Sequence, residues 1–95
     1  MLKPERTARF TRDMKKLVKN HTDIAPLIHV MQLILLDSAE SKTQLHHRHN
    51  AHALQGDLSG VYECHIDNAA DWLLLWERNN TIAVFLRTGK HDEVL

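Results

Sequence analysis

The chain has 95 residues, 43% hydrophobic and 25% charged, which predicts one small globular domain over residues 1–95. Its single cysteine, Cys64, excludes an internal disulfide and a cysteine-based zinc site, and the absence of a signal peptide or a bilayer-length apolar run predicts a cytoplasmic protein without membrane association. Net charge is formally zero, but residues 1–20 carry seven Lys/Arg against two acids, whereas residues 57–95 carry three against seven. The basic first segment suits a phosphate-bearing or acidic partner.

Residues 7–20 predict an amphipathic helix, because apolar side chains recur along one side of it with helical spacing. These side chains are Phe10, Met14, Leu17 and Val18. Thr7 can cap the helix start, and the basic residues between the apolar positions should face outwards. Before this helix, residues 2–6 allow a short strand, which Pro4 would confine to the edge of a sheet.

Residues 24–37 predict a second helix, which is apolar around most of its circumference and should be largely buried. Thr22 or Asp23 can cap its start. The following residues, 38–60, are polar and are predicted to form one long loop. Loops of that length in a compact domain are usually functional or mobile.

The second half of the chain predicts strands. In GVYECHID the side chains alternate, which places Tyr62, Cys64 and Ile66 on a buried side and Glu63, His65 and Asp67 on a polar side. DWLLLWER is apolar on both faces, as is typical of a central strand. Two asparagines then signal a tight turn, and TIAVFLR is the next strand. The predicted class is therefore α+β, with two N-terminal helices packed on a small antiparallel sheet.

Four of the eight histidines lie between residues 46 and 52, where a metal site has to be considered. A loop without cysteine and without fixed helical spacing defines no coordination geometry, so we expect no metal and no other cofactor. Glycine-rich nucleotide-binding motifs are missing. Cys64 is a poor nucleophile candidate, because the alternation places it on the buried side.

Acid/base chemistry has better support, because titratable residues gather at predicted strand ends and loops. His52 ends the polar loop, His65 lies on the polar side of a strand, and Asp71 opens the next strand. Arg87 ends the last strand, and His91 follows four residues later. Such groups can cleave a phosphodiester: one takes the proton of a ribose 2′-hydroxyl, another protonates the leaving oxygen, and the arginine stabilises the phosphorane.

The order of motifs in residues 52–91 resembles the YafQ-type branch of the RelE/ParE toxin superfamily. H-x-L-x-G, E-C-H-I, D-W-L-L-L and R-T-G-x-H follow one another in matching strand context, and the N-terminal helices fit in length and placement. This resemblance implies a RelE-like fold and the toxin of a type II toxin–antitoxin system. Toxins of this kind are ribosome-dependent mRNA endonucleases (mRNA interferases) that inhibit translation and are held inactive by a cognate antitoxin.

Carried over position by position, the resemblance implies a catalytic set: His52, His65, Asp71, Arg87 and His91. It implies supporting or RNA-binding roles for Glu63, Trp72 and Lys90. The expected partners are an antitoxin encoded alongside, the ribosome with its mRNA, and operator DNA only through the antitoxin complex. Ribosome binding would use the basic residues of the first helix: Arg9, Arg12, Lys15, Lys16 and Lys19. Three histidines are interpreted as residues of the loop without a chemical role: His46, His47 and His49.

Four features depart from the family pattern. Ala51 stands where the family often has Asp, the segment 66–70 is longer than usual, and Leu95 stands where an aromatic residue is common. The neutral net charge also differs from the basic charge of many relatives. A second interpretation therefore stays open, in which a degenerate, non-catalytic toxin fold binds its antitoxin and takes part in operon autoregulation.

Overall fold

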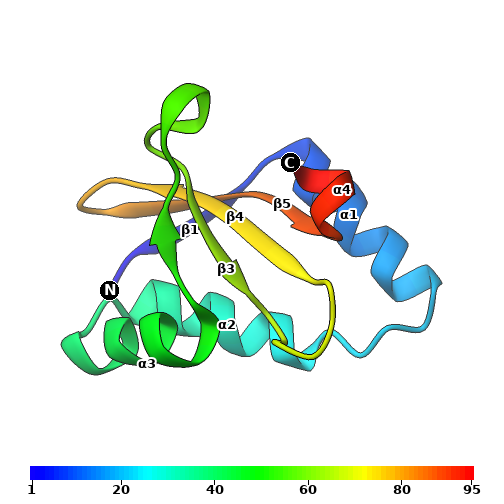
Figure 1. Ribbon diagram of the computed structural model, residues 1–95, viewed down its shortest axis with the longest axis horizontal. Coiled ribbons are helices and arrows are strands. Elements are labelled where there is room, and N and C mark those ends of the chain that lie inside the picture. Colours follow the sequence, from blue (N-terminus) through cyan, green and yellow to red (C-terminus); the bar gives the residue numbers. More distant parts are fainter.

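The computed structural model describes residues 1–95 and contains four α-helices and five strands (Figure 1). The helices are α1 (Ala8–Lys19), α2 (Ala25–Leu36), α3 (Ala39–His49) and α4 (His91–Val94). The strands are β1 (Lys3–Arg6), β2 (His52–Ala53), β3 (Tyr62–His65), β4 (Leu73–Arg78) and β5 (Ile82–Gly89), and a short 3-10 turn covers Gly56–Leu58. No helix combines the length and the apolar character needed to cross a bilayer.

All five strands form one sheet in the order β1-β5-β4-β3-β2. The predicted antiparallel meander is confirmed as β3, β4 and β5, and the central strand β4 is buried over Leu73–Trp76. The possible N-terminal strand is also present: β1 pairs in parallel with β5 at the sheet edge, where Pro4 is tolerated. The α+β class is therefore confirmed, although the sheet has one parallel edge strand and the chain has two helices more than expected.

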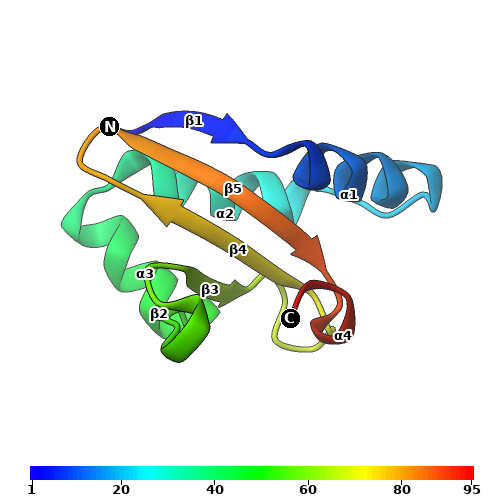
Figure 2. The same ribbon diagram turned by 90° about the horizontal axis from the view of Figure 1, so that it is seen from above.

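α1 begins where the sequence predicts and is fixed against β5. The Thr7 hydroxyl oxygen accepts the Phe10 backbone N–H at 3.0 Å, and the same hydroxyl donates to the Leu86 carbonyl oxygen at 2.8 Å. Phe10 is fully buried, and its ring lies 5.7 Å from the ring of Phe85 between centroids. Figure 2 shows that α1 continues the line of β1 beside the end of β5.

α2 and α3 lie beneath one face of the sheet (Figure 1), and the main core fills the space between these helices and the sheet. Helix residues in this core include Leu27, Val30 and Leu45. Cys64 is a fully buried residue of the sheet, and burial raises the pKa of its thiol to about 12. A thiol with that pKa is not a thiolate at neutral pH, so Cys64 is a structural residue, as its predicted buried side indicates.

The prediction of one long loop over residues 38–60 is wrong, because α3 occupies its first half. Ser38 and Ser41 exchange hydrogen bonds of 3.0 Å in a capping box at the start of α3, and Asn50 ends the helix with a φ of 51°. Apart from Ser41, only Leu45 of α3 is buried, so the sequence of this helix carries almost no apolar periodicity. Three of the clustered histidines therefore lie on its last turn: His46, His47 and His49.

The opposite face of the sheet is only partly covered. Leu73 and Leu75 are buried there beneath Val94 of α4 and beneath Leu54 and Val61 of the β2–β3 hairpin. In Figure 1 the hairpin and α4 rise from the two ends of this face. The open part between them is where the candidate site lies.

Candidate active site

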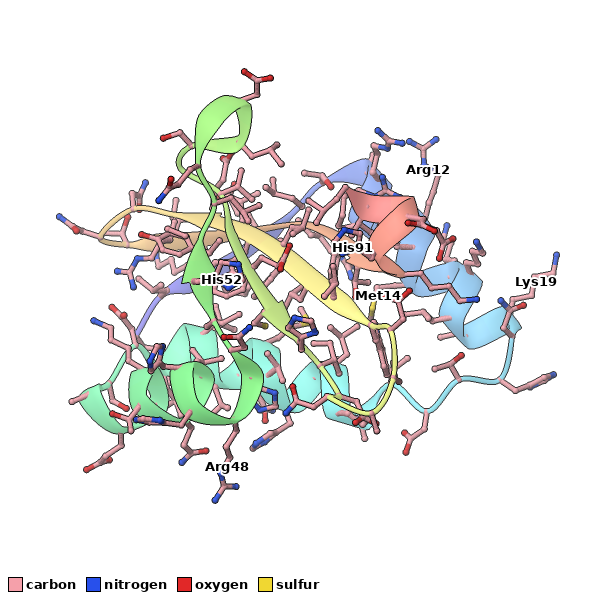
Figure 3. The ribbon with its side chains drawn as sticks, in the orientation of Figure 1. Arg12, Met14, Lys19, Arg48, His52 and His91 are labelled. Carbon is pink, nitrogen blue, oxygen red and sulfur yellow. The ribbon has the colours of Figure 1, made fainter.

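Three predicted site histidines reach the open face from separate segments: His52 on β2, His65 on β3 and His91 at the start of α4. His52 pairs with Glu63, and His65 lies two residues beyond Glu63 on the same face. His65 pairs with Leu73 on β4, and Leu73 pairs with Gly89 on β5. Gly89 comes two residues before His91. Because neighbouring strands lie about 4.8 Å apart, the row from β2 to β5 spans roughly 15 Å. Figure 3 shows His52 and His91 on either side of β4.

Two contacts hold the ring of His52. Its Nδ1 lies 2.7 Å from the Asn50 carbonyl oxygen, and its Nε2 lies 3.6 Å from Oε1 of Glu63. A carbonyl oxygen can only accept, so Nδ1 carries a proton and Nε2 is the nitrogen free to exchange one. Glu63 lies on the polar side of β3 as predicted, and only 8% of its side chain is exposed. Glu63 thus faces His52 across the strand pair and is placed to orient that imidazole.

A hydrogen bond from α3 holds the backbone of His65. The Nδ1 of His49, on the last turn of α3, lies 2.8 Å from the His65 carbonyl oxygen. Nδ1 therefore donates to that oxygen and ties α3 to the end of β3. The prediction that His49 lies in a loop is wrong, because it ends α3 and bonds to β3.

His91 is the first residue of α4, and its backbone N–H donates to Oδ1 of Asp71 at 2.9 Å. The turn from β5 into α4 passes through Gly89, whose φ of 151° favours glycine. A Cβ at Gly89 would also come within 3.4 Å of the Val94 side chain. This sharp turn brings His91 beside Asp71, which lies in the loop before β4.

Arg87 forms an ion pair with a residue to which the sequence assigned no role. Its Nε donates to Oδ2 of Asp13 at 2.8 Å and its Nη2 donates to Oδ1 at 3.2 Å. The same carboxylate accepts the Thr88 backbone N–H at 3.1 Å, and the pairing raises the pKa of Arg87. The guanidinium has five N–H donors, so about three remain for a phosphate oxygen. The one local signal for Asp13 is that it is an acid within the otherwise basic α1.

A second ion pair joins α1 to α4. Nζ of Lys16 lies 2.6 Å from Oε2 of Glu93, which lowers the pKa of Glu93 and raises that of Lys16. Lys16 was expected to face the ribosome, but it points to α4. The other predicted basic residues of α1 are exposed: Arg9, Arg12, Lys15 and Lys19. Figure 3 shows Arg12 and Lys19 projecting away from the sheet.

Trp72 helps to hold together the strands that carry the site residues. Its indole Nε1 donates to the Thr88 hydroxyl oxygen at 2.9 Å, and that hydroxyl donates to the Leu73 carbonyl oxygen at 2.8 Å. Thr88 is only 2% exposed, so this chain of hydrogen bonds fixes the start of β4 against the end of β5. Lys90 is the exposed residue that precedes α4, and its backbone N–H donates to Oε1 of Glu93 at 3.2 Å.

A cavity of about 550 Å³ lies between α1, the loop before β4 and the turn into α4. Its charged lining comes from all three segments: Asp13, Lys16, Asp71, Lys90 and Glu93. Within residues 1–95, no group of three or more His, Cys, Asp or Glu side chains is arranged to hold a metal ion. Carboxylate and ammonium groups therefore line this cavity, and Asp13 and Asp71 in its lining bind Arg87 and His91.

Comparison with known proteins agrees with this fold and identifies the family. Residues 2–95 match the family described as bacterial toxin of type II toxin-antitoxin system, YafQ. The mRNA interferase toxin YafQ of Escherichia coli K12 is 28% identical over 87 residues, which cover 92% of this chain and 88% of that protein. A chain of the E. coli DinJ-YafQ toxin-antitoxin complex has a TM-score of 0.81 at 26% identity, covering 99% of this chain and 97% of its own length.

A metal-bound toxin from Helicobacter pylori has a TM-score of 0.83 at 29% identity, and the match covers 100% of both chains. The family match extends over nearly the whole sequence, including the N-terminal helices that carry no motif of their own. The resemblance first noted in residues 52–91 is therefore confirmed. This chain belongs to the YafQ family of bacterial type II toxin-antitoxin toxins.

Proposed function

We propose that this chain is an endoribonuclease that acts in the cytoplasm and cleaves mRNA on the ribosome. Its family membership and its likeness to a protein named as an mRNA interferase support this activity. The observation that carries the proposal is the placement of three imidazoles, from His52, His65 and His91, on one open face of the sheet. Arg87 comes from the strand that leads to His91.

The reaction is an attack of the ribose 2′-hydroxyl on the adjacent phosphorus. A neutral imidazole takes the 2′-hydroxyl proton, the O2′–P bond forms, and the P–O5′ bond breaks. A protonated imidazole gives its proton to the departing 5′ oxygen, so the products are a 2′,3′-cyclic phosphate and a 5′-hydroxyl. The N–H donors of Arg87 that Asp13 leaves unused stabilise the charge on the phosphorane oxygens.

The outer side of α1 is the proposed contact with ribosomal RNA. Arg9, Arg12 and Lys19 lie along one side of the helix and are exposed, and Lys15 adds a further exposed cation. Lys19 lies ten positions after Arg9, a distance of about 15 Å along a helix. Because the chain is neutral overall, this local basic surface supplies most of the attraction to phosphate.

The proposed partner is a small antitoxin encoded alongside, since the related E. coli YafQ is found in a complex with DinJ. Contact with operator DNA is expected only through the antitoxin complex. Growth provides the test. Induced expression of this chain alone should stop translation and growth, and co-expression of its genomic neighbour should restore both. Tight antitoxin binding without growth arrest would instead support a non-catalytic binding module.

Removal of metal is expected to leave both the fold and the cleavage rate unchanged. The proposed chemistry uses side-chain acids and bases only, although a related H. pylori toxin was solved with bound metal. The measurement compares protein dialysed against EDTA with untreated protein, after return to the magnesium buffer that ribosomes need. A large drop in melting temperature, or loss of cleavage that zinc or copper restores, would show that the histidines hold a metal.

A further inference from the structure

We infer that Asp71 is a positioning residue, which acts on the reaction by holding the backbone of His91, and not an acid or base itself. The inference rests on the proposed cleavage activity and assigns Asp71 a role different from the one that family resemblance suggests. Asp71 lies in the loop between β3 and β4, and Oδ1 of its carboxylate accepts the His91 N–H at 2.9 Å across 20 residues of sequence.

α4 needs such support, because it has only four residues. A helix of one turn does not form by itself in water, and the N–H groups of its first turn have no partner within the helix. The residue before it, Lys90, makes no side-chain hydrogen bond that caps the helix. Asp71 therefore supplies from another segment the acceptor that a capping residue normally provides.

The carboxylate of Asp71 is itself presented by a rigid part of the chain. The next residue, Trp72, donates its indole N–H to the buried Thr88, and Thr88 donates to the Leu73 carbonyl oxygen. These bonds fix the chain directly after Asp71, where it enters β4. The position of Asp71 is thus transmitted to His91 through one hydrogen bond.

Besides the bond from the Lys90 N–H to Glu93, two contacts hold α4 to other segments, and neither involves its first residue. Lys16 pairs with Glu93 in the middle of the helix, and Val94 packs on the sheet near its end. Without the bond from Asp71, α4 stays attached while the His91 imidazole is free to shift. A misplacement of about 1 Å in a reacting group can lower a rate by roughly a hundredfold.

Asparagine and alanine at position 71 separate positioning from acid/base chemistry. Asp71→Asn keeps a carbonyl oxygen that accepts the His91 N–H, so its cleavage rate should stay within about tenfold of wild type. Asp71→Ala removes the acceptor and should lower kcat on the order of a hundredfold, with KM little changed. The pH–rate profile of Asp71→Asn should keep both limbs. Asp92→Asn, on the same short helix, is the charge-matched control and should be silent.

Backbone amide NMR of the free protein tests the hydrogen bond without any cleavage. The His91 amide should be protected from exchange in wild type and in Asp71→Asn, and exposed in Asp71→Ala, while all melting temperatures stay similar. Asp71→Asn as inactive as Asp71→Ala, with one limb of the pH profile lost, would overturn the inference and make Asp71 an acid or base. An unchanged His91 amide in Asp71→Ala would overturn it as well. Failure of wild type to cut mRNA would refute the proposed function and the catalytic part of this inference, while the amide measurement still decides the contact.

Discussion

His91→Ala should lower the rate of mRNA cleavage on the ribosome by a factor of roughly a hundred to ten thousand, the usual range for loss of a general acid or base. The backbone of His91 is fixed from another segment by Asp71, and His91 follows two residues after the end of the strand that carries Arg87. The protein should still fold, because His91 is an exposed residue at the start of a one-turn helix. Single-turnover cleavage of ribosome-bound mRNA measures the effect.

His46→Ala is the matched control for His91→Ala. It removes an imidazole from the exposed last turn of α3, so both cleavage and melting temperature should stay close to wild type. His52→Ala should fall in the same range as His91→Ala, because His52 faces Glu63 at the other end of the row. If His91→Ala folds and cuts as fast as His46→Ala, His91 takes no part in the chemistry.

Arg87→Ala should lower the cleavage rate by on the order of a hundredfold or more, as loss of one electrostatic partner of a transition state typically does. The variant also leaves Asp13 without its cation, and the Asp13 side chain is only 15% exposed, so some loss of stability is expected. Thermal melts and the double variant Asp13→Ala/Arg87→Ala separate the two effects. The double variant should regain stability but not activity.

Asp13→Ala alone gives the complementary result. It frees the guanidinium while keeping its charge at the site, so its loss of activity should be smaller than that of Arg87→Ala. Arg87→Lys should rescue little, because an ammonium cannot make the two-point contact with Asp13 and reach a phosphate at the same time. Equal rates for wild type and folded Arg87→Ala would mean that the ion pair with Asp13 is purely structural.

The sequence predicts well those helices and strands whose buried residues follow a regular pattern along the chain. The spacing of Phe10, Met14 and Leu17 predicts α1, and the continuous apolar run in β4 predicts a central strand. α3 was missed for the opposite reason, because it buries only Ser41 and Leu45 and owes its start to a capping box. A one-turn helix such as α4 has too few residues to show any period.

The candidate site was predicted by its residue types but not by its contacts. The acid/base residues stand near strand ends in the sequence. The register of the strands places His52 and His65 on one face, and the turn after β5 brings His91 to Asp71. The ion pair of Arg87 with Asp13 joins residues 74 positions apart, so no local pattern reveals it. The burial of Glu63 was missed too, because alternation assigns a side chain to a face but does not say what covers that face.

Mapping of the cut ends on programmed ribosomes tests the proposed activity most directly. Purified wild-type protein is added to ribosomes that hold a defined mRNA codon in the A site, primer extension locates the cut, and the chemistry of the new 3′ end is determined. We expect cleavage within that codon, with a 2′,3′-cyclic phosphate or 3′-phosphate at the new end, and no cleavage of the same mRNA without ribosomes. Intact mRNA in the presence of folded protein that binds its antitoxin would contradict the proposal and identify the chain as a binding module.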